Sequence, residues 1–384
     1  MDSPRRRSTN LERAAVIDAA RAAGADSVRI APAAALADTR AALAAAFARG
    51  DFATWPYGPA YAERAADPTR LLAGARSVIC IAVAYALPVP ARTRGRGRVS
   101  NYAWSADYHR RLRDLLGAVA AHIDACAGAA VTAIACDTAP LAERAFAARS
   151  GLGWIGKHTN LIAPGIGSFV FLGEIVTTLD LEPDPPLRKT CGTCSRCVAA
   201  CPTGALRGDY TIDATRCISD LTQRTGPIPR ELRSAIGEWI WGCDLCQQVC
   251  PPTQRGRRGG ASFAPLDDET AAPDLSALLR LRSAEFKRRY AQTAMGWRGA
   301  AVLRRNAAVA LGNGLDRADV PVLGTALRAD PHPLVRGHAA WALGRIGSPR
   351  ALRLLRDTQQ RETDSWAAAE IAAALEPHGP LDAL

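Results

Sequence analysis

At the centre of the chain stands the run Cys191-Gly-Thr-Cys194-Ser-Arg-Cys197-Val-Ala-Ala-Cys201-Pro202. A second set follows, with an isolated Cys217 and then Cys243-Asp-Leu-Cys246-Gln-Gln-Val-Cys250-Pro251. Together they hold all but three of the 11 cysteines. Three thiolates on one tight loop can bind three irons of the same metal cluster. A fourth cysteine that precedes a proline lies on the next turn of the chain, too far away to bind that cluster. The eight thiolates are the ligand count of two four-iron clusters.

The spacing matches bacterial ferredoxins with two 4Fe–4S clusters, in which the fourth cysteine of a run binds the other cluster. The same logic predicts one cluster held by Cys191, Cys194, Cys197 and Cys250. It predicts a second held by Cys201, Cys217, Cys243 and Cys246. The chain is therefore expected to move electrons. The long insertion between Cys217 and Cys243 departs from the simple pattern, and we expect it to contact another part of the protein.

Zinc and disulfide bonds are the alternative uses of these cysteines. Structural zinc sites use two Cys-x2–4-Cys pairs separated by a longer loop, which the dense first run fits poorly. Disulfides need an oxidising compartment, and charged residues interrupt any export signal at the N-terminus. No run approaches the roughly 18 apolar residues of a membrane span. We expect a soluble, cytoplasmic protein, in which Cys80, Cys126 and Cys136 are buried packing residues.

The order of helical and strand patterns predicts an α+β multidomain chain. Residues 1–180 should form an α/β domain, with helices over 11–23 (capped by Asn10), 33–49 and 112–126 and strands over 27–31, 77–84, 131–136 and 169–177. Residues 181–255 should form the two-cluster, ferredoxin-like domain. Residues 256–384 should form a linker and a helical domain.

The helical domain contains an internal repeat. Arg304-Arg-Asn-Ala-Ala-Val-Ala-Leu-Gly312 returns as Arg336-Gly-His-Ala-Ala-Trp-Ala-Leu-Gly344, and a degraded third copy ends in Ala372-Ala-Ala-Leu375. Helix pairs that recur at this period stack into a HEAT-like α-solenoid. Such a solenoid is either a docking surface or a support for the neighbouring domains.

The net charge of +11 comes almost entirely from arginine. Basic clusters occur at residues 5–7, 92–98, 255–258 and 287–289. Guanidinium groups bind phosphate oxygens bidentately, so these clusters suit a nucleic-acid backbone. A solubilising surface is the alternative.

Polar and glycine-rich residues follow the strand predicted over 131–136. Asp137-Thr-Ala-Pro comes first, at the strand end where ligands of open α/β sheets bind. A helix with Glu143 and Arg144 follows, and then Gly151-Leu-Gly-Trp-Ile-Gly156-Lys157-His158. The glycines would let backbone approach a large flat ligand. Asp137 is equally consistent with a helix N-cap, and Lys157 and His158 with surface residues.

The order of these motifs resembles the epoxyqueuosine reductase family. The shared features are Asp137-Thr-Ala-Pro, Glu143-Arg144, the Gly-Leu-Gly-Trp-Ile-Gly-Lys-His loop, Gly167-Ser168, both cysteine runs and Arg305-Asn306-Ala in a HEAT-like tail. Upstream, Tyr102-Ala-Trp104 and Asp107-Tyr108-His109 fit the same family. The resemblance spans nearly the whole chain.

The resemblance implies a cobalamin-dependent oxidoreductase of queuosine biosynthesis. It would reduce epoxyqueuosine to queuosine at the wobble position (34) of tRNAs with a GUN anticodon, those for Asp, Asn, His and Tyr. Electrons would pass from an external flavodoxin- or ferredoxin-type donor through two 4Fe–4S clusters to Co(I)/Co(II) cobalamin, and the epoxide oxygen would leave as water. The enzyme would be a monomer that does not associate with a membrane.

The resemblance also assigns site residues. Asp137 would be the proton donor, kept neutral by burial beside the corrin. The expected cobalamin contacts are Arg64, Tyr102, Asp137, Gly156, His158 and Ser219. His109 is not expected to bind cobalt, because Asp107-Tyr-His109 lacks the glycine of the Asp-x-His-x-x-Gly motif. Two alternatives remain, a corrinoid reductive dehalogenase and a non-catalytic iron–sulfur electron carrier.

Overall fold

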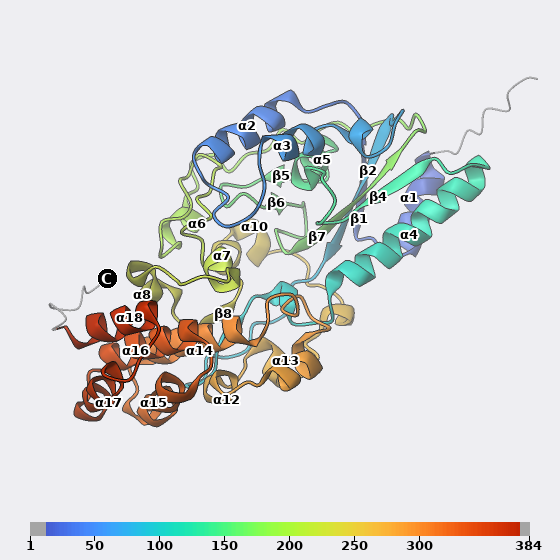
Figure 1. The fold of residues 1–384 in the computed structure, drawn as a ribbon. Coiled ribbons are helices and arrows are strands. Elements are labelled where there is room, and N and C mark those ends of the chain that lie inside the picture. The colour runs from blue at the N-terminus through green and yellow to red at the C-terminus, as the bar shows by residue number, and fades with distance from the viewer. Residues whose placement is uncertain (1–12, 377–384) are drawn as a thin grey trace, which may run out of the picture. The chain divides into compact units, whose positions relative to one another are not determined.

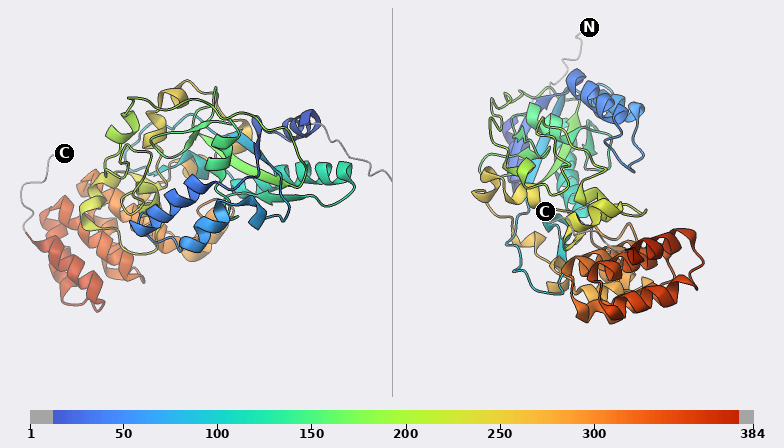
Figure 2. Two further views of the ribbon diagram at one scale, coloured as in Figure 1. Left: turned by 90° about the horizontal axis from the view of Figure 1, so that it is seen from above. Right: turned by 90° about the vertical axis from the view of Figure 1, so that its left-hand side faces the viewer.

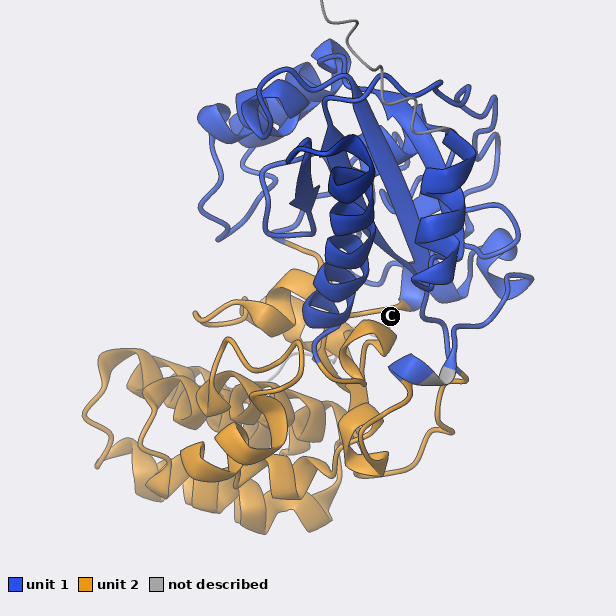
Figure 3. Ribbon diagram, turned by 90° about the vertical axis from the view of Figure 1, so that its right-hand side faces the viewer, with its two compact units in different colours: residues 1–87, 107–215, 245–263 blue, residues 88–106, 216–244, 264–384 orange. Residues whose placement is uncertain are grey.

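The computed structural model describes residues 13–376, which form two compact units (Figure 3). Unit 1 comprises the chain up to Leu87, Asp107–Thr215 and Leu245–Phe263. Unit 2 comprises Pro88–Ala106, Arg216–Asp244 and the chain from Ala264 onward. Each unit is therefore built from three separate segments, and the division into 1–180, 181–255 and 256–384 stays a prediction.

Unit 1 is built on a four-stranded sheet with the order β1-β2-β7-β4 (Figure 1). Its strands are β1 (Ser27–Pro32), β2 (Ser77–Ala84), β7 (Val170–Thr177) and β4 (Thr132–Ala135). Every residue of β2 is buried, as its continuous run of β-branched and apolar residues predicts. All neighbouring strands pair antiparallel, so the rule that places ligands at the carboxyl edge of a parallel sheet does not apply here.

Helices cover both faces of this sheet. On one face lie α1 (Arg13–Ala22) and α4 (Tyr108–Ala127), and α5 (Glu143–Arg149) packs on the other (Figure 1). The α4 side chain Leu116 lies so close to Gly173 of β7 that a Cβ there would meet it at 2.8 Å. This mixed helix-and-strand layer matches the predicted fold class.

Unit 1 contains further α-helices and two short strands. They are α2 (Ala37–Ala48), α3 (Pro59–Ala65), β5 (Trp154–Ile155), β6 (Leu161–Ile162), α6 (Arg196–Ala199), α9 (Leu245–Gln248) and α10 (Pro251–Gln254). The helix predicted over 33–49 begins later than expected, because Ala33 donates its N–H to Arg76 beside the sheet and Leu36 donates to Ala66. The predicted cap Asn10 lies outside the described residues.

One cysteine prediction is wrong. Cys80 and Cys136 are buried as expected, but Cys126 is exposed. The buried stripe of α4 ends at Ile123, and the last turn of the helix extends beyond it.

Unit 2 is mainly helical. Its helices are α7 (Ile218–Gln223), α8 (Arg233–Ile236), α11 (Asp268–Ala271), α12 (Leu275–Leu279), α13 (Ser283–Tyr290), α14 (Ala300–Gly314), α15 (Val320–Ala329), α16 (Pro333–Ile346), α17 (Pro349–Gln359) and α18 (Ser365–Leu375). The strands β3 (Arg98–Val99) and β8 (Trp239–Trp241) pair in parallel. Within the described residues, no helix is long and apolar enough to cross a membrane.

The repeat predicted from the sequence forms stacked helices, α14, α16 and α18, coloured orange to red in Figure 2. A Cβ on Gly312 of α14 would lie 2.8 Å from the Cα of Ala342 in α16. A Cβ on Gly344 of α16 would lie 2.8 Å from the carbonyl oxygen of Ala374 in α18. The same glycine of successive copies therefore allows the next helix to pack closely, as in a HEAT-like solenoid.

Candidate active site

Asp137 lies on the loop between β4 and α5 in unit 1. Its φ angle is 51°, in the left-handed region that residues with a side chain seldom adopt. Its side chain is 56% exposed, and its backbone N–H donates a hydrogen bond to the Glu143 carboxylate. Because α5 starts at Glu143 with Ala142 as its N-cap residue, the N-cap interpretation of Asp137 is wrong. Strained backbone that the surroundings hold in place clusters at functional sites.

His109 on α4 contacts this carboxylate. Its Nε2 lies 2.9 Å from Asp137 Oδ2, and its Nδ1 lies 2.6 Å from Asp107 Oδ1. Burial lowers the pKa of His109, but the hydrogen bonds to Asp107 and Asp137 outweigh it and raise the pKa to about 9. A protonated imidazole therefore joins the two carboxylates at neutral pH.

His158, at the end of the glycine-rich loop, has a buried side chain. Asn160 donates its N–H to His158 Nδ1 at 3.2 Å, so the proton of the neutral ring is on Nε2. Within residues 13–376 this buried Nε2 has no hydrogen-bond partner. Burial lowers the pKa of His158 to about 4. A Cβ on Gly156 would lie 2.9 Å from His158 Cε1.

These observations fit a flat ligand with polar substituents. The neutral His158 offers a buried N–H donor, and such a donor costs about 1–3 kcal/mol when it is left without an acceptor. Gly156 has no side chain to block approach to the ring. Amide side groups of a corrin provide acceptors of the required kind, so the residues present fit a cobalamin.

Two long side chains join the parts of this region. Arg144 Nη1 donates to the Thr159 carbonyl at 2.8 Å, which links the start of α5 to the glycine-rich loop. Lys157 Nζ donates to the Gly192 carbonyl at 2.9 Å, directly after the first cluster cysteine. The Asp137 loop, the glycine-rich loop and the first cysteine run therefore form one connected region of unit 1.

The cysteines predicted for the first cluster lie near one another. Burial raises the pKa of Cys197, and the charges of Cys191 and Cys250 raise it further. Burial likewise raises the pKa of Cys250, with Cys191 and Cys194 adding to the effect. All four are free thiols, but among residues 13–376 no three or more His, Cys, Asp or Glu side chains are placed to hold a metal ion, so this ligand set also rests on the spacing of the sequence.

The cysteines predicted for the second cluster come from segments of both units. Cys201 and Cys246 belong to unit 1, and Cys217 and Cys243 belong to unit 2. All of these are free thiols. This assignment rests on the spacing of the sequence.

The remaining predicted cobalamin contacts also divide between the units. Arg64 is exposed on α3 in unit 1. Tyr102 and Ser219 belong to unit 2. The Tyr102 hydroxyl accepts a hydrogen bond from Trp241 Nε1 at 2.8 Å, and Ser219 Oγ accepts one from Gln223 Nε2 at 3.1 Å.

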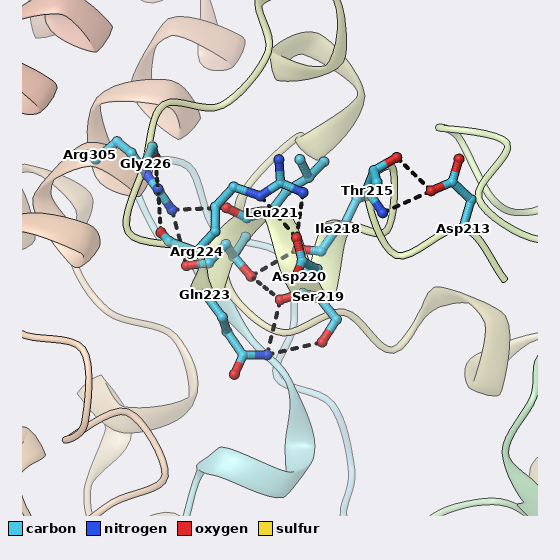
Figure 4. Close-up of polar contacts among 11 residues, drawn as sticks. Asp213, Thr215, Ile218, Ser219, Asp220, Leu221, Gln223, Arg224, Gly226 and Arg305 are labelled. Atoms are coloured by element: carbon cyan, nitrogen blue, oxygen red, sulfur yellow. Dashed lines mark hydrogen bonds and ion pairs between the residues drawn. The ribbon is translucent and has the colours of Figure 1, made fainter. Parts of the chain in front are cut away.

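The insertion after Cys217, which the sequence predicts to contact another part of the protein, contacts the repeat helices, a partner that the sequence did not identify. Arg305 of α14 is fully buried and donates to the carbonyls of Leu221, Thr222, Arg224 and Gly226 (Figure 4). Asn306 donates to the carbonyls of Thr222 and Ile240. Burial, together with the charges of Arg224 and Arg233, lowers the pKa of Arg305 to about 9. The sequence contained Arg305-Asn306 as a motif, but nothing in it revealed this role.

The basic cluster at residues 92–98 is engaged within unit 2. Arg92 lies 3.3 Å from the Glu238 carboxylate, and Arg94 and Arg96 pair with Asp316 and Glu269. The Arg98 guanidinium lies 4.2 Å from the centroid of the Trp239 ring. These arginines therefore already have protein partners, a distinction that composition could not reveal. The cluster at residues 5–7 lies outside the described residues.

An aromatic cluster near Asp137 was not predicted. The rings of Tyr57 and Tyr61 are tilted by 37° with their centroids 4.5 Å apart, and Phe47, Phe52 and Trp55 continue the cluster. Burial raises the pKa of Tyr57, and the charge of Asp137 adds to the shift. The density of aromatic residues over 47–61, in a chain with only 6% of them, was the available signal.

Comparison with known proteins identifies the family. A model described as "Epoxyqueuosine reductase QueG, DUF1730" matches residues 65–138, one for a 4Fe–4S double cluster binding domain matches 190–253, and one for HEAT repeats matches 298–376. An epoxyqueuosine reductase of Bacillus anthracis is 37% identical over 320 residues, which cover 82% of this chain and 84% of the relative. The chain belongs to the epoxyqueuosine reductase family.

Solved structures of the family agree in fold. A crystal structure of selenomethionine-labelled epoxyqueuosine reductase is similar with a TM-score of 0.88 and 34% identity, covering 94% of this chain and 97% of that one. The same values hold for a crystal structure of an epoxyqueuosine reductase with an epoxyqueuosine-modified tRNA-Tyr stem loop. The prediction of an epoxyqueuosine reductase with a double-cluster domain and HEAT repeats is therefore confirmed.

Proposed function

We propose that this protein reduces epoxyqueuosine to queuosine at position 34 of tRNA. The epoxide oxygen leaves as water, and the reaction consumes two electrons and two protons. The observation that carries the proposal is the exposed Asp137 carboxylate, held at a left-handed turn beside His109 and joined through Arg144 to the glycine-rich loop. Membership of the family favours this reaction over the dehalogenase and electron-carrier alternatives.

Cobalamin is the cofactor proposed for the reducing step. Bound there, it would supply a low-valent cobalt centre that delivers electrons to the substrate. The proposed contacts are Arg64, Tyr102, Asp137, Gly156, His158 and Ser219. The protein's part is to hold the macrocycle, exclude water and place protons.

Two 4Fe–4S clusters are proposed as the path of the electrons. One would be bound by Cys191, Cys194, Cys197 and Cys250. The other would be bound by Cys201, Cys217, Cys243 and Cys246. Clusters with four thiolate ligands reach low potentials, and a flavodoxin- or ferredoxin-type protein is the proposed donor.

Asp137 is proposed as the acid that protonates the epoxide oxygen. Its carboxylate is exposed and accepts a hydrogen bond from His109, so the described residues alone do not provide the burial that the sequence-based hypothesis requires. Bound substrate and cofactor would exclude water and favour the protonated form. The imidazolium of His109 can meanwhile keep the carboxyl oriented.

The proposed substrates are tRNAs with a GUN anticodon, which the enzyme would modify in the cytoplasm as a monomer. The basic residues at 255–258 and 287–289 would supply positive charge that attracts the phosphates of tRNA. Contact with phosphates would make affinity for tRNA fall as the salt concentration rises.

The proposed function can be tested with anaerobically reconstituted full-length protein. Epoxyqueuosine-containing tRNA should lose one oxygen atom per modified nucleoside, as measured by mass spectrometry of the digested tRNA. Asp137→Asn should slow conversion by about 10²–10⁴-fold, while corrinoid absorption bands remain. Conversion by Asp137→Asn at the rate of the unaltered protein would exclude Asp137 as the acid.

A further inference from the structure

The imidazole of His109 lies between two carboxylates of unit 1. Its Nε2 lies 2.9 Å from Asp137 Oδ2, and its Nδ1 lies 2.6 Å from Asp107 Oδ1. Within residues 13–376 only Oδ2 of the Asp137 carboxyl has a hydrogen-bond partner, and this side chain is 56% exposed. One oxygen of the carboxyl therefore contacts the imidazole, while the other is open to a ligand.

Packing and capping fix the position of this imidazole. The ring of Tyr108 stacks on the His109 ring with the centroids 4.0 Å apart, and on the ring of Phe171 in β7 at 4.2 Å. Asp107 is the N-cap residue of α4, and its carboxylate also accepts the His109 backbone N–H at 3.1 Å. The ring is therefore held with one nitrogen on each carboxylate.

Asp107 favours a charged imidazole whether or not Asp137 carries a proton. Burial lowers the pKa of His109, but the hydrogen bonds to Asp107 and then to Asp137 outweigh it and raise the pKa to about 9. Because Asp107 contacts a separate ring nitrogen, its effect persists when Asp137 is neutral. The other charged groups around the two carboxylates are Arg110, Arg113, Glu143 and Arg144.

The stoichiometry of the proposed reaction requires a second proton. An epoxide takes up two electrons and two protons, both carbon–oxygen bonds break, and the products are a carbon–carbon double bond and water. The electrons come from the external low-potential donor. The Asp137 carboxyl holds only one proton, and bulk water is excluded while substrate is bound. Among residues 13–376, His109 is the titratable side chain that forms a hydrogen bond to this carboxyl.

We propose that His109, held by Asp107, supplies the second proton of each turnover through the Asp137 carboxyl. Asp137 gives the first proton to the oxygen as the first carbon–oxygen bond breaks. The imidazolium then passes its proton from Nε2 to Oδ2. Rotation of the carboxyl about its Cβ–Cγ bond, a torsion with broad preferences, presents this proton to the hydroxyl, which leaves as water. This inference rests on the proposed function, and His109 acts through Asp137 without contacting substrate.

The order of acidities supports this transfer. Water has a pKa far above that of an imidazolium, so a departing hydroxide takes a proton even from a histidine whose pKa is raised. The raised pKa in turn keeps His109 protonated at neutral pH before each turnover. After product release, solvent can return one proton to His109 and one to Asp137.

A purely orienting role for His109 is the competing explanation. Asp107→Asn distinguishes the two roles, because asparagine keeps an oxygen that can cap the helix and accept a hydrogen bond from the ring. It removes only the negative charge beside Nδ1. An orienting role therefore predicts an unchanged pH profile in Asp107→Asn, whereas proton supply predicts that the profile moves with the pKa of His109.

Single-turnover conversion of epoxyqueuosine-containing tRNA over a range of pH tests the proposal. In the unaltered protein the rate should fall as the pH rises through about 9 and His109 loses its proton. In Asp107→Asn this fall should move to lower pH by about one unit or more, because a charge-assisted hydrogen bond is lost. Exposed Asp114 on the same helix is the matched control, and Asp114→Asn should keep the original profile.

His109→Gln gives a second test. Its amide can still donate a hydrogen bond to Asp137 but has no proton to transfer. This variant should be slower by about tenfold or more at neutral pH and should lose the inflection near pH 9. His122→Gln, on the exposed part of α4, should retain the full rate. If one of the two test variants does not fold, the other still decides between the two roles.

Nitrogen NMR of the histidine rings in the full chain, without substrate, gives a readout independent of turnover. The signal that is absent in His109→Gln should titrate near pH 9 in the unaltered protein and at lower pH in Asp107→Asn. Titration at or below 6.5 in the unaltered protein, or the same pH–rate profile with and without Asp107→Asn, would overturn the proposal. If the unaltered protein makes no queuosine, the proposed function itself fails. Normal conversion with an unmoved profile in Asp107→Asn contradicts only the role of His109.

Discussion

His109 Nε2 lies 2.9 Å from Asp137 Oδ2, while its Nδ1 contacts Asp107. One imidazole of α4 therefore connects the start of its own helix to the loop after β4. Opposite charges at this separation stabilise each other, and the effect is larger where the site is partly shielded from water. The side chain of His109 is only 19% exposed, so the contact should contribute to stability.

Replacing His109 should reduce stability in a pH-dependent way. The pKa of His109 is raised from 6.5 to about 9, so its contribution is fully present below pH 6.5 and is lost as the pH rises through about 9. His109→Gln should lower the free energy of unfolding by roughly 2 kcal/mol near pH 6, and by much less near pH 10. Urea denaturation at both pH values measures this. Exposed His122 on the same helix is the control, and equal losses at both pH values would contradict the prediction.

Adding a methyl group at Gly156 should weaken corrinoid binding. The new Cβ would lie 2.8 Å from Ile162 Cδ1 and 2.9 Å from the His158 ring, so the ring or the backbone must shift. Gly156→Ala should reduce corrinoid affinity by at least about tenfold, measured by anaerobic absorption titration. Gly117→Ala is the control, because a Cβ at Gly117 meets nothing within 4 Å. Equal corrinoid affinities in the two variants would show that the glycine-rich loop does not contact the cofactor.

Loss of Cys250 should remove one cluster while leaving the other cysteine set intact. Cys250→Ser should lower the iron content of the anaerobically reconstituted protein from about eight atoms per chain to about four. Iron and acid-labile sulfide analysis gives the measurement. Cys126→Ser should keep both clusters, because Cys126 is exposed on α4. Full iron content in Cys250→Ser would show that another residue completes the cluster.

Truncation of Arg305 should loosen the insertion after Cys217. Its guanidinium satisfies backbone carbonyls of residues 221–226 (Figure 4). Arg305→Met should cost about 3 kcal/mol of stability and speed hydrogen exchange of amides in α7. Arg328→Met is the control, since Arg328 is exposed on α15. If exchange in α7 does not change, Arg305 is not what orders this helix.

Much of the fold followed from local pattern. The buried run at residues 77–84 predicted β2 with both ends correct, and the recurring Ala-Ala-x-Ala-Leu-Gly predicted the stacked repeat helices. Helix starts were less accurate. Residues 33–36 have a helical composition, but the backbone N–H groups of Ala33 and Leu36 donate to the carbonyls of Arg76, just before β2, and Ala66, just after α3. Tertiary hydrogen bonds overrode the local preference there.

Sequence by itself determined the chemistry that this protein can hold. The cysteine spacing predicts two 4Fe–4S clusters, because three thiolates on one tight loop can bind three corners of a cluster. The glycines at 151, 153 and 156 carry no side chain that would block a ligand. Only the tertiary structure decided which charges meet. It brought His109 to Asp137, and it paired Arg92, Arg94 and Arg96 with distant carboxylates. Electrostatic interactions depend on distances across the fold and on exclusion of water, and a linear sequence specifies neither directly.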